Sequence, residues 1–238
     1  MTAKRVVQGL IVTAALCLST TSVRAQGYRF FIMGADSRLT DQRSFREGPN
    51  GTSSIPFGSR YAGGGKVIAG VEVPLDKIFG VEGSYGFGQN NLELNYLIYN
   101  PVEVKGYGVR NNRFSVDIVG HLPGVWRGIR AYGVMGPEFD LFSPTSSAQT
   151  SATTQGFAFA PSAKLASEGH PGFNVGAGID YKVASKVDLR IDVREHMTGS
   201  PRLGLPNAAT STSAAYFPVG GPAYDLEYSL GIVYRFGK

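Results

Sequence analysis

The sequence predicts an all-β fold, an eight-stranded antiparallel up-and-down transmembrane β-barrel preceded by a cleaved N-terminal signal peptide. Three observations support this: an export-type N-terminal segment, period-two alternation of apolar and polar residues, and connections that alternate between long and short. No stretch approaches the roughly 20 apolar residues that a spanning helix needs. A mean hydropathy of -0.06 is compatible with a barrel, because transmembrane strands alternate and average to neutral.

The first 25 residues have the three parts of a secretory signal peptide. Lys4 and Arg5 precede an apolar run over residues 9–18, and a small residue, Ala25, ends the segment where cleavage is expected. We therefore expect residues 1–25 to be removed and residues 26–238 to form the barrel domain.

The only cysteine, Cys17, lies inside the apolar run. Lipid attachment at Cys17 is an alternative, which Leu16 disfavours because a small residue is expected at that position. Without Cys17 the barrel would contain no disulfide. The segment also holds three of the 23 basic residues, which leaves 20 basic against 18 acidic, so the charge does not indicate a nucleic-acid partner.

Eight segments have the alternation and length of membrane-crossing strands. They are residues 27–36, 65–74, 78–90, 112–121, 128–141, 172–183, 187–197 and 224–236. The connections between them are about 28, 3, 21, 6, 30, 3 and 26 residues long. Short periplasmic turns and long extracellular loops alternate in this way in outer-membrane barrels, and an even number of strands places both termini in the periplasm. The long loops are rich in Gly, Ser, Thr, Ala and Pro, as in residues 143–155, and we expect them to order only weakly.

The segment 187–197 alternates most sharply. Its even positions are charged or polar, namely Asp188, Arg190, Asp192, Arg194 and His196, and its odd positions are apolar, namely Val187, Leu189, Ile191 and Val193. A soluble exported barrel that binds an apolar ligand would place the apolar face inside, whereas a membrane barrel places it outside.

The export signal, the loop lengths and the aromatic residues near both strand ends favour the membrane barrel. The aromatic residues are Tyr28, Tyr181, Tyr234 and Phe236 at the turn side and Phe87, Phe114, Phe142, Phe173 and Tyr224 at the loop side. An arginine facing the middle of the bilayer would cost about 2–4 kcal/mol, so we expect the charged face to line the lumen.

The short turn at residues 184–186 also predicts a strand register. It places Val183 opposite Val187, which sets Lys182 against Asp188 and Asp180 against Arg190. Both charged pairs have opposite sign.

Three segments resemble the small outer-membrane β-barrel family typified by the transmembrane domain of OmpA. Val175 to Arg194 is similar to the family's penultimate hairpin, Tyr228 to Phe236 to its final strand, and Val71 to Tyr85 to its second-to-third hairpin. The resemblance covers most of the mature chain as a pattern, and it implies a barrel in the lipid bilayer of a Gram-negative-type outer membrane. It also implies recognition by the barrel-assembly machinery, which commonly reads a terminal aromatic residue. Here Gly237 and Lys238 follow Phe236.

Charged residues that share the predicted inner face form a candidate lumen charge network. The set comprises Glu72, Glu82, Asp117, Asp180, Lys182, Asp188, Arg190, Asp192, Arg194, Glu227 and Arg235. Eight strands leave an interior just wide enough for side chains, so paired charges that plug the barrel are the favoured interpretation. A small or gated diffusion pore, opened when pairs exchange, is the alternative.

The sequence predicts no catalytic, cofactor or metal site. His121, His170 and His196 have no metal-ligand spacing, and His196 is expected to point inward rather than toward the lipid, where a lipid-modifying barrel enzyme would need it. The predicted function is a non-enzymatic integral outer-membrane protein with a structural or surface-interaction role. Its partners would be the bilayer and the assembly machinery, with the surface ligand unassigned.

Overall fold

The computed structural model describes residues 27–39, 42–47, 54–96, 103–154, 162–206, 217 and 221–237. Its elements are β1 (Arg29–Leu39), β2 (Gln42–Glu47), β3 (Ser54–Ala62), β4 (Gly64–Pro74), β5 (Phe79–Tyr96), β6 (Glu103–His121), β7 (Ile129–Pro144), α2 (Ser146–Thr154), β8 (Glu168–Lys182), β9 (Val187–Gly199) and β10 (Pro222–Arg235). The predicted signal peptide, residues 1–25, lies outside the described residues. Within the described ranges, no helix is long and apolar enough to cross a membrane.

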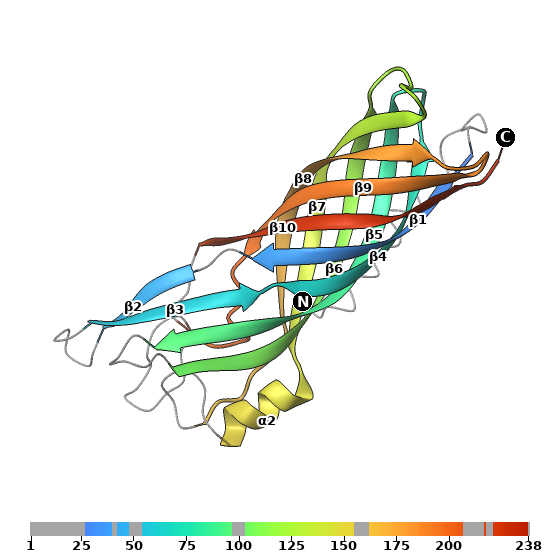
Figure 1. The fold of residues 1–238 in the computed structure, drawn as a ribbon. Helices are drawn as coiled ribbons and strands as arrows, with labels where there is room; N and C mark the ends of the chain where they lie inside the picture. Colours follow the sequence, from blue (N-terminus) through green and yellow to red (C-terminus); the bar gives the residue numbers. More distant parts are fainter. Residues whose placement is uncertain are drawn as a thin grey trace.

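Eight strands close into an antiparallel barrel (Figure 1). Around the wall each strand pairs with the next in the order β1, β4, β5, β6, β7, β8, β9 and β10, and β10 pairs back onto β1. The closing pair sets Arg29 opposite Arg235 and Leu39 opposite Asp225. The eight predicted strands and their up-and-down order are confirmed.

The two ends of the barrel differ in their connections. We call the end with the short turns, residues 75–78, 122–128 and 183–186, the turn end, and the opposite end the loop end. The three short connections are confirmed, each one residue longer than predicted. The beginning of β1 and the end of β10 meet at the turn end, where the backbone N–H of Phe236 donates to the carbonyl of Tyr28 over 2.7 Å.

A side chain stabilises the first of these turns. The Asp76 carboxylate accepts hydrogen bonds from the backbone N–H groups of Phe79 and Ile78, at 2.7 and 2.6 Å. These bonds stabilise the ionised form and lower the pKa of the fully exposed Asp76 from its ordinary value. The turn is therefore a defined structure rather than a loose link.

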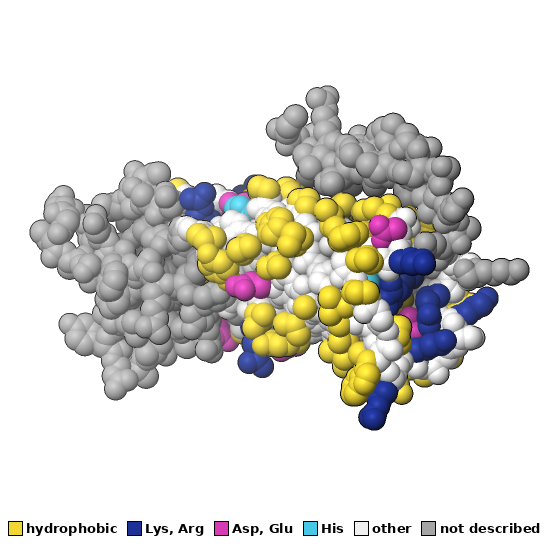
Figure 2. All heavy atoms as spheres, turned by 90° about the horizontal axis from the view of Figure 1, so that it is seen from above, with side chains coloured by type: hydrophobic (Ala, Val, Ile, Leu, Met, Phe, Trp, Pro, Cys, Tyr) yellow, Lys and Arg dark blue, Asp and Glu magenta, His cyan; other side chains and the backbone are white. Residues whose placement is uncertain are grey.

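Apolar side chains cover the outer face of the barrel wall between its two ends. In β9 the outward residues Leu189, Ile191 and Val193 are exposed, whereas Arg190 and Arg194 between them are buried. Figure 2 shows hydrophobic side chains spread over the outside of the barrel. A soluble barrel would have the reverse arrangement, so the structure does not support the soluble alternative.

This pattern reverses along the strands near the loop end. In β5 the inward residue Glu82 is charged and fully buried, but ten residues further on the inward residue is Leu92, also fully buried. The neighbours of Leu92 on the outer face, Asn91 and Glu93, are polar. Apolar residues inside and polar residues outside are typical of a sheet in water, so the strands continue beyond the lipid-facing zone.

An apolar cluster fills the interior at the loop end, and we call it the cap cluster. Its members are Leu39, Leu92, Tyr107, Val109, Phe142, Ala148, Ala152, Ala163, Leu165, Leu203, Leu205, Phe217 and Ala223. Phe142, predicted to belong to the outer aromatic girdle, is only 1% exposed inside this cluster. That prediction was wrong because β7 extends past the lipid-facing zone at Phe142. Other girdle residues, such as Tyr181 and Phe173, are exposed as predicted.

Two strands lie in the first long connection, which the sequence suggested was a single loop. β2 pairs with β3, and β3 pairs with the outer part of β5, from Phe57 opposite Tyr96 to Ala62 opposite Asn91. β4 reaches only as far as Gly88 on β5, so β3 supplies backbone partners to a stretch of edge that would otherwise lack them. Figure 1 shows β2, β3, β5 and β6 projecting together at the loop end.

The helix α2 also lies where only weak order was expected. Thr145 caps it, with its side-chain oxygen accepting from the backbone N–H of Ala148 over 3.2 Å. Ala148 and Ala152 lie one turn apart, and both are buried in the cap cluster. A capping threonine and two alanines four residues apart are the signals that could have predicted this helix.

Candidate functional site

The predicted inner face is the inner face of the structure. Of the eleven residues in the predicted lumen charge network, nine are buried, Arg235 is half-buried and Lys182 is exposed at the turn end. The predicted register is also confirmed, with Lys182 opposite Asp188 and Asp180 opposite Arg190.

Arg190 is the centre of the network. Its guanidinium is fully buried and contacts carboxylates from three other strands: Asp180 at 2.9 Å, Glu82 at 2.8 Å and Glu72 at 3.0 Å. The guanidinium carbon also lies 5.0 Å from the ring centroid of Phe31 and 4.7 Å from that of Tyr132. Arginine suits this position because its planar fork makes several directed hydrogen bonds while its faces stack on aromatic rings.

Arg194 continues the network toward the loop end. It contacts Glu82 at 2.7 Å, Asp117 at 3.1 Å and Asp192 at 2.8 Å. Glu82 uses one oxygen for Arg190 and the other for Arg194, so a single carboxylate joins the two arginines. The Tyr132 hydroxyl donates to Asp192 over 2.5 Å.

A further cluster lies between Arg194 and the cap cluster. Arg113 contacts Asp140 at 2.8 Å, Asp225 at 3.0 Å and Glu227 at 3.3 Å. Lys66 contacts the same two carboxylates of β10, Asp225 at 2.8 Å and Glu227 at 3.1 Å. Both cations are buried, so this cluster closes the lumen with a second set of ion pairs.

At the turn end the pairing differs from the prediction. Arg29 contacts Glu72 at 2.8 Å and also donates to Asp180. Asp188 makes its closest ion pair with Arg235, at 2.6 Å, although Lys182 is the residue opposite it in the sheet. Lys182 is exposed and makes no ion pair within the described part of the chain. The register was therefore right, but the expected partner of Asp188 was wrong, because Arg235 reaches it from the neighbouring strand.

The interior contains more carboxylates than cations. Among the described residues, ten Asp and Glu side chains are buried in the polar interior, against five Lys and Arg side chains and two histidines. His196 lies 2.6 Å from Glu138 and His121 lies 2.7 Å from Glu72, so each histidine contacts a carboxylate. Within this part of the chain no group of three His, Cys, Asp or Glu side chains is arranged to hold a metal ion.

Glycines leave space for this network. A Cβ atom at Gly178 would lie 2.4 Å from the Tyr132 hydroxyl, and one at Gly176 would lie 2.7 Å from a side-chain carbon of Arg194. The absence of a side chain at these two positions therefore leaves room for the network inside a crowded barrel.

The prediction missed several members of the network. The missed residues are Arg29, Lys66, Arg113, Glu138, Asp140 and Asp225. Each lies an even number of positions from an inward-facing residue of its own strand, as Arg113 does from Asp117 and Lys66 from Glu72, and therefore shares its face. Extending the two-residue alternation along the whole of each strand would have identified them.

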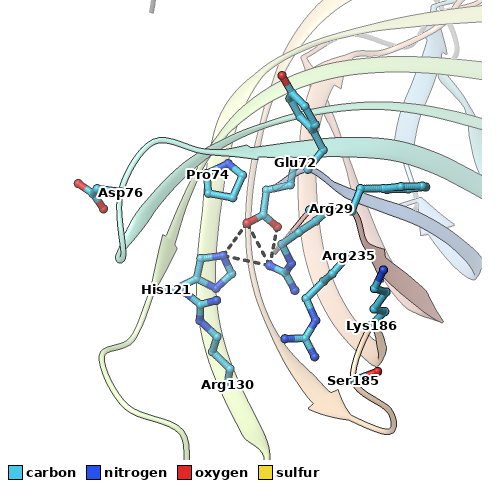
Figure 3. Close-up of a pocket in the computed structure, with 12 residues that line it drawn as sticks. Arg29, Glu72, Pro74, Asp76, His121, Arg130, Ser185, Lys186 and Arg235 are labelled. Atoms are coloured by element: carbon cyan, nitrogen blue, oxygen red, sulfur yellow. Dashed lines mark hydrogen bonds and ion pairs between the residues drawn. The ribbon is translucent and has the colours of Figure 1, made fainter. Parts of the chain in front are cut away.

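The spaces left inside the barrel are small and uneven. Between Lys66, Arg113, Arg194 and His196 only about 10 Å³ is open. A cavity of about 250 Å³ lies at the turn end (Figure 3). The lumen is therefore nearly filled at the level of these four residues and has open space at its turn end.

Comparison with known protein families matches residues 13–236 to the outer membrane protein beta-barrel domain. The chain belongs to this family of outer-membrane β-barrels. The apolar outer face therefore lies in the lipid bilayer of the outer membrane.

Solved structures agree with this fold. The barrel is similar to the outer membrane protein OprG from Pseudomonas aeruginosa, with a TM-score of 0.55 at 12% identity over 89% of this chain and 97% of that one. It is also similar to the outer membrane protein AlkL in DMPC lipid bilayers, with a TM-score of 0.52 at 13% identity over 92% and 95% of the two chains. At these identities the likeness shows the fold alone. Comparison with curated protein sequences found no match.

Proposed function

We propose that this outer-membrane barrel is a closed, non-enzymatic membrane anchor that presents its loop end at the cell surface. The observation that carries the proposal is the Arg190 cluster, in which a fully buried guanidinium joins carboxylates of β4, β5 and β8 across the lumen. Together with the clusters at Arg194 and Arg113, it fills the cross-section with paired charges. An ion could pass only if several buried pairs separated at the same time.

The cap cluster supports a role for the loop end. Strands, the helix α2 and the connecting segments contribute to one buried apolar core beyond the lipid-facing zone. A core of this kind holds a surface in a defined shape, as in a soluble domain. Surface interaction would then depend on this part of the molecule, while the barrel wall holds it in the membrane.

The histidine geometry argues against catalysis on lipid. His196 is 3% exposed and lies between Glu138 at 2.6 Å and Glu227 at 3.6 Å. It points into the lumen, so it does not meet a lipid substrate at the outer face.

Conductance measurement tests the closed lumen. The refolded protein in a planar bilayer is expected to show no steady single-channel conductance. A steady conductance of porin size would overturn the proposal. Migration on a detergent gel before and after boiling provides the folding control, since the intact barrel is expected to migrate differently from the boiled chain.

We further propose that the turn end and both termini face the periplasm and that the loop end faces outward, as short turns and long loops do in this class. The C-terminal end of β10 and the following Phe236 would then be available to the assembly machinery. Two exposed positions can be converted to cysteine for labelling, Ser185 in the turn before β9 and Thr153 in α2. A membrane-impermeant maleimide is expected to label Thr153→Cys on intact cells and Ser185→Cys only after the outer membrane is permeabilised. The reversed pattern would refute this orientation.

A second candidate function, a narrow cation path, rests on the excess of buried carboxylates over buried cations. Such a path would select cations, because carboxylate rings attract them. Brief openings with strong cation selectivity in the same bilayer recordings would favour it over the closed anchor.

A further inference from the structure

The opening of the lumen at the turn end, which we call the turn-end mouth, contains a cavity of about 250 Å³ that the ion-pair network does not fill. Its lining includes Arg29, His121, Arg130, Lys186 and Arg235, and Figure 3 shows these side chains arranged around one space. A second cavity, of about 130 Å³, shares Arg29, Arg130 and Arg235 with the first. Three arginines from β1, β7 and β10 therefore line both spaces.

The donors at this mouth are not fully used. Arg29 is 5% exposed, yet its Nε has no hydrogen-bond partner among the described residues, and the same holds for Nε of Arg235. His121 Nδ1 is a third buried polar atom without a partner there. Buried polar groups are normally paired, so an unpartnered polar atom on each of three side chains that line the cavity indicates that these side chains lack part of their usual set of hydrogen-bond partners within the described part of the protein.

Two further cations at the mouth make no close ion pair with a carboxylate of the described residues. Arg130 donates to the backbone carbonyl of Lys77, and neither Arg130 nor Lys186 makes an ion pair within the described ranges. Figure 2 shows Lys and Arg side chains gathered at this end of the barrel. Four cationic side chains line the larger cavity, against the carboxylates of Glu72 and Asp76, and Glu72 already pairs with Arg29 and Arg190.

The interior behind the mouth has the opposite character. Among the described residues behind the linings of these two cavities, seven buried carboxylates lie against four buried Lys and Arg side chains, so an anion that entered the mouth would be repelled from going further. The mouth is therefore a terminal site for an anion rather than the entrance to an anion channel.

We propose that the turn-end mouth binds a small oxyanion of the phosphate class, held by Arg29, Arg130, Lys186 and Arg235. The planar fork of arginine matches the oxygens of a phosphate, and lysine adds a point charge. The cavity lies below the usual size range of pockets for drug-sized ligands, which suits a small group. The source of that group is either free phosphate or the headgroup of an anionic lipid.

Calorimetry of the refolded barrel tests the site. In octyl glucoside micelles, which contain no phosphate, titration with inorganic phosphate at constant ionic strength is expected to show saturable binding to one site. The double variant Arg130→Gln, Lys186→Gln is expected to bind on the order of tenfold more weakly, because two charged donors are lost. Both residues lie outside the buried ion pairs, so the double variant is expected to fold. If the double variant does not fold, the single variant Lys186→Gln replaces it in the titration.

A matched control removes two charges at the loop end instead. Arg38 and Lys164 are both exposed there, and Arg38→Gln, Lys164→Gln is expected to bind phosphate as the unmodified barrel does. Absence of saturable binding, or equal weakening in both double variants, would overturn the proposal.

Phosphate titration of the barrel in lipid nanodiscs then distinguishes free phosphate from a lipid headgroup as the occupant. Weaker phosphate binding in phosphatidylglycerol than in phosphatidylcholine would support a lipid headgroup as the occupant, and equal binding would support a free anion.

Discussion

Replacing Arg190 with methionine should destabilise the barrel strongly. The change removes charge-assisted hydrogen bonds to three carboxylates, those of Asp180, Glu82 and Glu72, from a fully buried site. Removing one member of a buried ion pair typically costs about 3–5 kcal/mol, because the partner charge stays buried. The carboxylates keep other cations, since Arg29 contacts Glu72 and Asp180, and Arg194 contacts Glu82. We therefore expect a loss of about 3–5 kcal/mol rather than a sum over three separate pairs.

Urea unfolding in phospholipid vesicles measures this loss. The fluorescence of the single tryptophan, Trp126, which is 67% exposed in a turn of the folded chain, follows the unfolding. Leu189→Met is the matched control, because it changes the adjacent outward residue by a volume-conserving substitution and should cost less than about 1.5 kcal/mol.

A double-variant cycle sharpens the test. Adding Glu82→Gln to Arg190→Met removes one of the unbalanced carboxylates, so the double variant should be more stable than the sum of the two single changes indicates. A loss below about 1 kcal/mol for Arg190→Met would refute the reasoning, since a buried partner charge could not then depend on this guanidinium.

Three further predictions concern the cap, the lumen and a turn. Phe142→Ala should cost about 3–5 kcal/mol because it empties a buried site in the cap cluster, whereas Phe87→Ala on the outer face should cost clearly less, as urea unfolding can show. Gly178→Ala should destabilise the barrel and lower its thermal unfolding midpoint, because the new Cβ would lie 2.4 Å from the Tyr132 hydroxyl; an unchanged midpoint would contradict the crowded lumen. The lowered pKa of Asp76 means that its ionised form stabilises the folded state above the ordinary aspartate pKa of about 3.9 and that this contribution is lost as the pH falls toward the folded value. The difference in urea midpoint between the protein and Asp76→Asn should therefore shrink below about pH 4, and a difference that does not change with pH would contradict it.

Much of the barrel wall could be predicted because strand geometry is local. Successive side chains point to opposite faces, so the alternation in residues 187–197 shows which residues share a face before any partner strand is known. The register between β8 and β9 followed for the same reason, since a short turn restricts which residues lie opposite each other.

The loop end was harder to predict because its environment changes within single strands. Phe142 continues the alternation of β7, but the solvent outside that strand is no longer lipid, so the apolar residue points inward. The helix α2 contributes to a core whose other members come from distant parts of the chain, and the pairing of β3 with β5 also joins distant segments. Only α2 carried a local signal, in Thr145, Ala148 and Ala152.

The sequence by itself determined the number of strands in the barrel wall, the inner and outer faces and the charged character of the lumen, because each depends on the two-residue repeat of an extended backbone. Only the tertiary structure decided which charges meet. Arg190 contacts three strands, and Asp188 pairs most closely with Arg235 rather than with Lys182 opposite it. The physical reason is that closure of the barrel brings together side chains far apart in the sequence, such as Lys66 and Glu227, which are 161 residues apart, where neither turn length nor alternation restricts the partner.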